Sequence, residues 1–322
     1  MQSATPLPSA TGFRSAAWFL AIGLALYAAA FAVSEILVYR TGRDNPFFKI
    51  ATTDRQELDW VILGASHAMP LDFAGVNASI ETATGRRILN LAGPGTGPLY
   101  NRYVFEQFLE THRTANVLYA LDSFAFQSRT WNEDRFADSK MLGRTPFDAA
   151  QSRRLFRHVV AEDVDARALL DYLTGFSKLN NRDRLQPDIW EGEAQFDRVN
   201  RPSAAADAKR IAYLYTDASR RDAAMQRYLA IFADTIELAR QRGIQVTVIK
   251  LPVPPQFYAK LPDEAAFDAR LTTLLAGKGV QFADFSTAMD EPRFYFDSDH
   301  LNRQGVELFV KTYLNPTLTG QR

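Results

Sequence analysis

Two short stretches at opposite ends of the chain carry residues that together could perform acyl transfer. Ser66 follows the apolar run 60–63 through a glycine and an alanine, and Asp297 and His300 lie three residues apart near the C-terminus. A serine hydroxyl becomes a nucleophile when a base reaches it. A carboxylate that orients an imidazole provides such a base. The sequence therefore predicts Ser66 as the nucleophile, His300 as the base and Asp297 as its orienting partner.

Each of these residues also has an ordinary structural explanation. A serine after Gly-Ala can cap the helix that follows it, and His300 can cap the last helix or bond a local carbonyl. Asp299 is a second candidate partner for His300, since the two are adjacent. His67 is either a turn residue or a substrate contact.

The elements expected around these residues alternate between strand and helix. The apolar runs predict strands at 59–64, 87–92, 116–122, 244–251 and 280–285. Helices are expected between and after them, at 71–84, 99–111, 204–242, 263–276 and 302–314. This alternation predicts an α/β fold with a parallel sheet and right-handed crossovers. Ligands bind at the carboxyl edge of such a sheet, which is where Ser66 would lie.

Residues 123–203 interrupt the alternation. They are rich in arginine, aspartate, phenylalanine and leucine, with helical patches at 149–160 and 164–172. We interpret this stretch as a helical insertion within a domain that spans residues 59–322. It is either a cover for one edge of the site, a partner surface or a solvated excursion.

The N-terminal part predicts a membrane anchor. Residues 1–14 are polar and proline-containing and are expected to be disordered, whereas residues 15–34 are twenty residues without a charge. A helix of that length rises about 30 Å, enough to cross the hydrocarbon core. We expect a transmembrane helix over 15–38 and a polar linker over 39–58. A buried core helix and a signal peptide cleaved near Ala30 are the alternatives.

Composition narrows the classes of function. The 322 residues have a formal net charge of zero, so nothing electrostatic favours a nucleic-acid partner. Cysteine is absent, which excludes disulfides and thiolate metal sites. Four histidines occur, and no two have the helical spacing of metal ligands. We therefore expect no metal, no organic cofactor and no nucleic acid.

In their order along the chain, these blocks resemble the SGNH (GDSL-like) hydrolase superfamily. In that family a serine follows strand one, a glycine follows strand two, an asparagine follows strand three, and Asp-x-x-His precedes the last helix. Three of the four blocks match over residues 59–315: Ser66, Gly95, and the pair Asp297 and His300. The resemblance implies a flavodoxin-like three-layer sandwich around a central parallel five-stranded sheet. It also implies an oxyanion hole made by the backbone N–H groups of Ser66 and Gly95, although Gly95 could equally serve only a turn.

The fourth block departs from the family pattern. Asp122 stands where the family has the asparagine that donates to the oxyanion. An ionised aspartate cannot donate a hydrogen bond and would repel the oxyanion. Either Asp122 faces away, or Asn101 or the Ser123 hydroxyl takes over, or hydrolysis is weak. His67, Asn101, Asp122 and Ser123 are therefore candidate substrate-binding residues.

This departure, together with the anchor, resembles membrane-anchored members that act in alginate O-acetylation and teichoic-acid D-alanylation. The resemblance implies a single-pass protein of a bacterial inner membrane, with its large domain in the periplasm or extracellular space. It also implies an acyl donor, a glycan or polyol acceptor and a membrane-bound O-acyltransferase partner in the same bilayer. Charge counting points the other way, since Arg40, Arg43 and Lys49 follow the span, but large domains can translocate despite such a bias.

Three functions follow from these observations. The first is a serine-dependent O-acyltransferase that modifies a cell-surface or secreted polysaccharide. The second is a plain anchored esterase, such as a carbohydrate esterase, which differs only in its acceptor. The third is a non-catalytic subunit that keeps the fold as a scaffold in a polysaccharide-modification complex.

Overall fold

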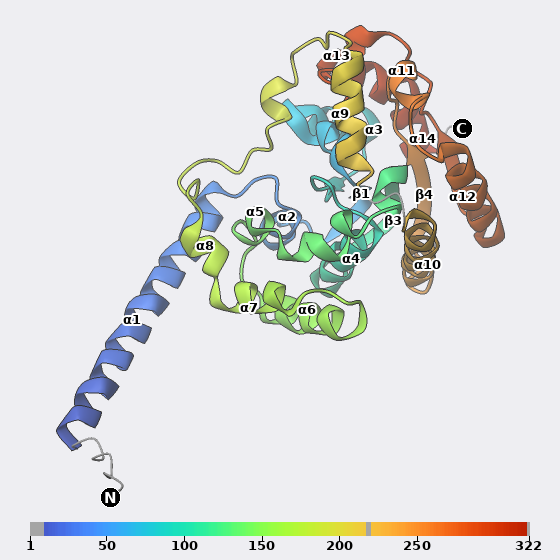
Figure 1. The fold of residues 1–322 in the computed structure, drawn as a ribbon. Helices are drawn as coiled ribbons and strands as arrows, with labels where there is room; N and C mark the ends of the chain where they lie inside the picture. Colours follow the sequence, from blue (N-terminus) through green and yellow to red (C-terminus); the bar gives the residue numbers. More distant parts are fainter. Residues whose placement is uncertain (1–9, 217–219, 321–322) are drawn as a thin grey trace, which may run out of the picture.

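One parallel sheet organises the molecule (Figure 1). The computed structural model describes residues 10–216 and 220–320. In sequence order the strands are β1 (Glu57–Gly64), β2 (Ile88–Asn90), β3 (Arg113–Leu121), β4 (Gln245–Lys250) and β5 (Gln281–Asp284). They lie in the order β2-β1-β3-β4-β5, and every neighbouring pair is parallel. This flavodoxin-like order places a crevice at the carboxyl ends of β1 and β3.

Helices cover both faces of the sheet, so the predicted three-layer α/β sandwich with five parallel strands is confirmed. One face is covered by α4 (Pro98–Thr111), α10 (Arg221–Arg240) and α12 (Glu264–Lys278), and the other by α3 (Val76–Thr84), α13 (Arg303–Phe309) and α14 (Asn315–Thr319). Side chains alternate along β1, with Val61 in the first layer of core and Ile62 in the second. The carboxyl-terminal parts of β1, β3 and β4 are buried on both faces and are mainly apolar, which made these strands recognisable in the sequence.

The remaining elements belong to the insertion, to the site or to connections. The insertion contains η2 (Ser123–Phe126), η3 (Arg129–Trp131), η4 (Glu133–Ala137), α5 (Ser139–Leu142), α6 (Ala149–Ala161), α7 (Ala166–Thr174), α8 (Phe176–Asn180) and η5 (Glu193–Gln195). The others are α1 (Ala10–Thr41), α2 (Pro46–Thr52), η1 (Ser66–Gly75), α9 (Ala204–Leu214), α11 (Pro255–Tyr258), η6 (Pro292–Phe294) and η7 (Val310–Leu314).

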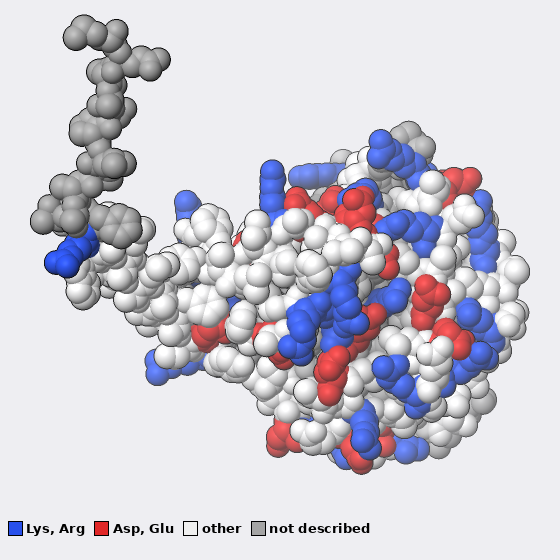
Figure 2. Space-filling view, turned by 90° about the horizontal axis from the view of Figure 1, so that it is seen from below, with Lys and Arg blue, Asp and Glu red and all other residues white. Residues whose placement is uncertain are grey.

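α1 projects from the domain as a single long helix (Figures 1 and 2). By length and composition, its residues Arg14–Thr41 could cross a membrane. The disordered start predicted for residues 1–14 lies partly outside the described residues. Residues 10–14 belong to the helix, since no proline after Pro8 interrupts it.

The predicted polar linker is wrong over residues 46–52, which form α2. The Asn45 side chain accepts hydrogen bonds from the backbone N–H groups of Phe47 and Phe48, at 2.9 and 3.2 Å, and so caps the helix. Pro46 fits the first turn, and Phe47 and Ile50 are buried in the core. A capped apolar turn therefore packs onto the domain where polar composition suggested a free connection.

Two predicted helices are each divided. The helix expected at 71–84 is η1 followed by α3, because Ala74 and Gly75 adopt left-handed backbone angles and break it. The helix expected at 204–242 is α9 and α10. Tyr215 leaves the helical path, and its hydroxyl lies 2.9 Å from the Ser123 hydroxyl. A tertiary contact thus ends a helix that the local pattern would continue.

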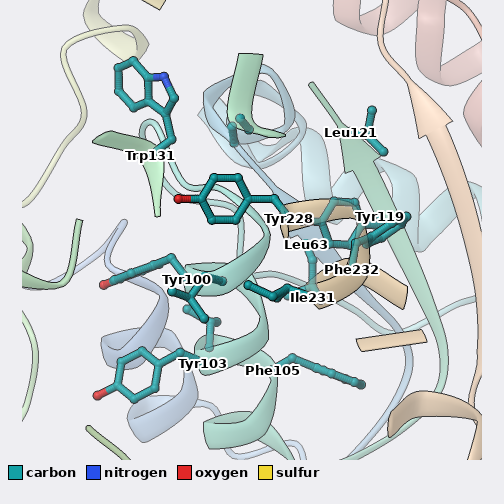
Figure 3. Packing of buried hydrophobic residues seen from close by; sticks show 14 of the residues in the cluster. Leu63, Tyr100, Tyr103, Phe105, Tyr119, Leu121, Trp131, Tyr228, Ile231 and Phe232 are labelled. Atoms are coloured by element: carbon teal, nitrogen blue, oxygen red, sulfur yellow. The ribbon is translucent and has the colours of Figure 1, made fainter. Parts of the chain in front are cut away.

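Aromatic packing holds α4 and α10 against the strands that carry the site. Figure 3 shows this core with residues of α4, α10, β1 and β3 side by side, among them Tyr100, Tyr103, Phe105, Tyr228, Phe232, Leu63 and Tyr119. The rings of Tyr119 and Phe232 are 4.7 Å apart. Packing at this density fixes the carboxyl ends of β1 and β3 relative to each other.

Candidate active site

Ser66 begins η1 at the carboxyl end of β1. The strand turns there through Gly64, whose φ is +154°. A Cβ at Gly64 would lie 2.5 Å from the carbonyl oxygen of Ala120 on β3, so only glycine allows this approach. The Gly-Ala-Ser sequence thus places the serine side chain at the edge of the sheet.

The loop before α13 brings His300 to this serine. His300 Nε2 lies 2.9 Å from Ser66 Oγ, and Nδ1 lies 3.0 Å from both carboxylate oxygens of Asp297. Asp297 also accepts the backbone N–H of His300, at 2.8 Å. Asn302 holds the loop by capping α13 at the Gly305 N–H, at 3.0 Å. The structure therefore brings the three predicted residues into one hydrogen-bonded chain.

Asp299 is a second carboxylate at the same imidazole. Its Oδ1 lies 3.2 Å from His300 Nδ1, and Arg210 Nε donates to its two oxygens at 2.8 and 3.1 Å. Burial alone would raise the pKa of Asp299, but Arg210 and His300 together hold it well below its usual range. Asp299 is thus an ionised, fully buried group that Arg210 binds, while Asp297 makes the shorter contact to His300.

His67 and Asp122 form a second charged pair, and the His67 ring lies beside that of His300. Its Nδ1 lies 2.5 Å from Asp122 Oδ1, and its Nε2 makes a poorly aligned 3.2 Å contact with Asp299 Oδ2. Its ring centroid is 4.5 Å from that of His300. Burial lowers the pKa of His67, but Asp122 and Asp299 outweigh burial and raise it to about 10. His67 is therefore an imidazolium at neutral pH, a role its sequence position did not indicate.

The contact with His67 changes the expected effect of the Asp122 carboxylate on an oxyanion. The carboxylate was expected to repel an oxyanion unless it faced away. It instead lies against the positive charge of His67, which neutralises it inside the site. A fixed imidazolium next to Ser66 therefore accompanies Asp122.

The environment of His300 favours its role as a base. Burial lowers the pKa of His300 and so does the charge of His67, but Asp297 and Asp299 raise it above its ordinary value. The rings of Trp190 and Phe296 lie 5.2 and 5.4 Å from the imidazole. These rings limit rotation of the imidazole and shield it from water.

The structure places the other candidate residues differently. Asn101 is buried behind β1, where it accepts the Gly64 N–H and donates to Thr96 O and Tyr119 Oη, at 3.2–3.3 Å. The Asn101 side chain thus holds the Gly64 turn, and its contact with a substrate stays a prediction.

Ser123 lies nearer the site. Its hydroxyl donates to buried Glu264, which Lys250 also binds at 2.5 Å. Ser123, His67 and Asp122 all line a cavity of about 30 Å³. That volume is enough for roughly one water molecule, so the side chain is close to the site without facing open space.

Gly95 occupies the loop after β2 with φ +61°. A Cβ there would lie 2.6 Å from both Arg135 Nη2 and the Trp131 ring. Packing against η3 and η4 therefore requires glycine at this position, whatever its N–H does. Arg135 fixes the same loop by donating to the Gly95 and Pro94 carbonyls, at 3.1 and 2.5 Å.

Among the described residues, His67, Asp299 and His300 could offer ligand atoms to a metal ion, all within 4.8 Å of one another. The donor set does not fit a cation, however. Arg210 already binds the Asp299 carboxylate, and the two ring nitrogens of His300 already contact Asp297 and Ser66.

Sequence reasoning missed Arg210 and Trp190. Arg210 lies in a helical region of mixed charge, where nothing distinguished it from a solvated side chain. Trp190 is a single large aromatic residue in an irregular polar segment, which is a weak signal for a tertiary contact. Both residues reach the site from segments far from it in the sequence.

Comparisons with known proteins give remote similarities. No protein-family model matches the chain, and no curated protein matches it. A Bacteroides fragilis protein assigned as an acylhydrolase is similar in structure, with a TM-score of 0.44 and 10% identity over 85% of this chain and 93% of that one. A GDSL-like lipase from Bacteroides thetaiotaomicron has a TM-score of 0.41 and 9% identity over 85% and 95%. At these values the likeness carries no conclusion about chemistry.

Proposed function

We propose that this protein is a membrane-anchored, serine-dependent acyl-transfer enzyme of the SGNH (GDSL-like) type. The observation that carries the proposal is the hydrogen-bonded chain from Ser66 Oγ through His300 to Asp297. Each link has the order and length that a nucleophile, its base and the orienting carboxylate require.

In the first half-reaction, Ser66 Oγ attacks the carbonyl carbon of an acyl donor while His300 Nε2 takes the hydroxyl proton. Asp297 holds the proton on Nδ1 and stabilises the imidazolium that forms. Collapse of the tetrahedral intermediate breaks the bond to the leaving alcohol, which receives the proton from His300. The acyl group is then esterified to Ser66.

In the second half-reaction, His300 takes a proton from an acceptor hydroxyl, which attacks the acyl carbon and releases Ser66. Water in place of that hydroxyl gives hydrolysis. The backbone N–H groups of Ser66 and Gly95 would receive the oxyanion in both steps, and losing one such donor typically costs about 2.7–4 kcal/mol. The positive charge of His67 offsets Asp122 and favours the developing negative charge.

We assign the acceptor and the location from the resemblance to polysaccharide-modifying proteins. The acceptor would be a hydroxyl of a glycan or polyol, and a membrane-bound O-acyltransferase would supply the acyl group. α1 would hold the domain on the outer side of a bacterial inner membrane. Contacts of Tyr27 and Phe31 with the insertion support a retained helix, since cleavage near Ala30 would remove Tyr27.

A fluorophosphonate probe on the full-length protein in detergent tests the serine chemistry, with intact mass as the readout. We expect one adduct on the wild type, none on Ser66→Ala or His300→Ala, and an unchanged adduct on Ser79→Ala, which alters an exposed helical serine. An adduct that survives Ser66→Ala contradicts the proposal. A folded wild type with no adduct favours the scaffold function.

Acceptor choice is tested separately from serine activation. We would incubate the protein with 4-nitrophenyl acetate, with and without an uncharged oligosaccharide. Acetylated oligosaccharide, absent with Ser66→Ala, indicates transfer. Release of acetate alone, at a rate the oligosaccharide does not change, indicates a plain anchored esterase.

A further inference from the structure

The insertion contacts α1 within the uncharged stretch of that helix. Tyr27 Oη donates to the carbonyl of Thr174, at 2.8 Å, and the rings of Phe31 and Phe147 meet edge to face at 5.9 Å. A Cβ at Gly175 would lie 2.5 Å from the Phe31 ring. The end of α7 and the start of α8 therefore lie directly against this part of α1.

The position of these contacts along α1 sets the depth of the insertion. The uncharged residues 15–34 rise about 30 Å, which is no more than the hydrocarbon core requires. If the bilayer ended before Tyr27, only about 18 Å of uncharged helix would remain to span it. Tyr27 and Phe31 must therefore lie inside the leaflet nearer the domain, and α7 lies at the same depth.

Glu35 directly follows the uncharged stretch of α1 and also contacts the insertion. It is the first charge after residue 34, and it is ion-paired to the buried Lys178 of α8, whose Nζ also lies 5.5 Å from the Phe31 ring. The Phe147 N–H donates to the same carboxylate, at 3.0 Å. A charge at the edge of the membrane is thus neutralised by the insertion itself.

The surface of the insertion beside α1 is apolar and exposed. We call it the α6–α8 face; its apolar side chains are Phe147, Phe156, Val160, Leu170, Leu173 and Phe176. On α6, Arg153 and Arg157 are also exposed and alternate with Phe156 and Val160 at helical spacing. A helix surface of this kind, apolar with basic residues, is typical of segments that lie in the membrane interface.

A groove lies between α6 and α7 on this surface. Its volume is about 590 Å³, and its lining includes the apolar side chains of Phe156, Leu169 and Leu173. Arg153 and Arg157 also line it, together with Arg154, which is ion-paired to Glu110. Figure 2 shows uncharged surface continuing from α1 onto the domain, with basic and acidic side chains intermixed beyond it. An apolar groove with a basic rim matches an acyl chain and an anionic headgroup.

We propose that the α6–α8 face is embedded in the near leaflet of an anionic phospholipid bilayer. Its apolar side chains contact acyl chains, and Arg153 and Arg157 contact phosphate groups. This inference rests on the proposed anchoring by α1. The domain is then held at two places, so it does not swing on a single helix, and Ser66 stays at a constant height above the membrane.

The test uses full-length protein reconstituted into vesicles of phosphatidylethanolamine and phosphatidylglycerol. The natural chain has no cysteine, so single cysteines can carry a nitroxide label without background. Labels at Leu170→Cys and Phe176→Cys probe the face, Phe19→Cys probes α1, and Leu308→Cys is an exposed apolar control on α13. Collision of each label with lipid-soluble oxygen and a water-soluble nickel complex is measured by electron paramagnetic resonance.

We expect positions 170 and 176 to favour oxygen over nickel several-fold more than position 308, as position 19 does. If they behave like position 308 while position 19 favours oxygen, the anchor stands and membrane docking is wrong. That outcome would leave the face for a protein partner. If position 19 also favours nickel, the proposed anchoring itself fails.

The headgroup contact is tested by lipid composition. With phosphatidylcholine in place of phosphatidylglycerol, we expect the oxygen preference at position 170 to fall. The double variant Arg153→Gln, Arg157→Gln should show the lower value in both lipids. An oxygen preference that neither change affects would overturn the anionic-lipid part of the proposal.

Discussion

The active-site edge of the sheet buries charged side chains, whereas the α6–α8 face exposes apolar ones. Asp299 and His300 are 0% and 1% exposed, whereas Leu170 and Phe176 are each 61% exposed. Buried charges are tolerated only when they are paired, and Arg210 pairs with Asp299 within the chain. Exposed apolar side chains in this density instead mark a surface that something outside the chain covers. The charges at the active-site edge are paired by other groups of the chain. The apolar side chains of the α6–α8 face instead need contacts from outside the chain, which we propose come from lipid.

The largest expected effect comes from removing the nucleophile at the polar edge. Ser66→Ala should lower the rate of ester turnover by about 10³-fold or more, because triad members act as a unit. The thermal unfolding temperature should change little, since the charged pairs around Ser66 remain. Rates and unfolding are measured on the same preparation. A variant that retains most of its activity would break the assignment of this edge as catalytic.

The pairing of the buried charges is tested by Arg210→Ala. The change leaves the Asp299 carboxylate buried without its main partner, and breaking such a pair typically costs about 3–5 kcal/mol of unfolding free energy. Arg270→Ala, which removes an exposed pair with Asp222, should cost about 1 kcal/mol or less. Denaturant unfolding of both variants provides the measurement. Equal costs would mean that the Arg210 pair is no more important than a surface one.

The charge of His67 makes stability depend on pH. Its pKa of about 10 lies above the ordinary value of 6.5, so its contribution is fully present below pH 6.5. That contribution is lost as the pH rises from about 6.5 towards 10. We expect the unfolding temperature to fall across this window and to fall less in His67→Gln. Parallel curves for the two proteins would show that His67 is not charged.

The smallest expected effect is that of truncating an exposed apolar residue of α6, for which its buried neighbour is the control. Leu155 and Phe156 are neighbours on α6, with 1% and 55% exposure. Leu155→Ala should cost about 2–5 kcal/mol of unfolding free energy in detergent. Phe156→Ala should change it by about 0.5 kcal/mol or less, because the ring packs on little of the domain. A large cost for Phe156→Ala would indicate that the ring packs on protein rather than facing outward.

Local patterns determined the elements and the order of the motifs. Continuous apolar runs indicate strands buried on both faces, and the small residues Gly64 and Ala65 indicate a tight turn before Ser66. Asp297 and His300 lie within one loop, so their spacing alone predicts that one can orient the other. The sequence also determined that residues 15–34 form an apolar helix, because twenty uncharged residues are a property of composition.

Only the tertiary structure decided which distant groups meet. His67 and Asp122 are 55 residues apart, and Arg210 and Asp299 are 89 apart, so no local pattern relates them. The same holds for Asn101, which supports the Gly64 turn from 37 residues further along the chain. Contacts of this kind depend on how helices pack across the sheet. Periodicity determines which side of a helix is buried, but only packing determines which residue it is buried against.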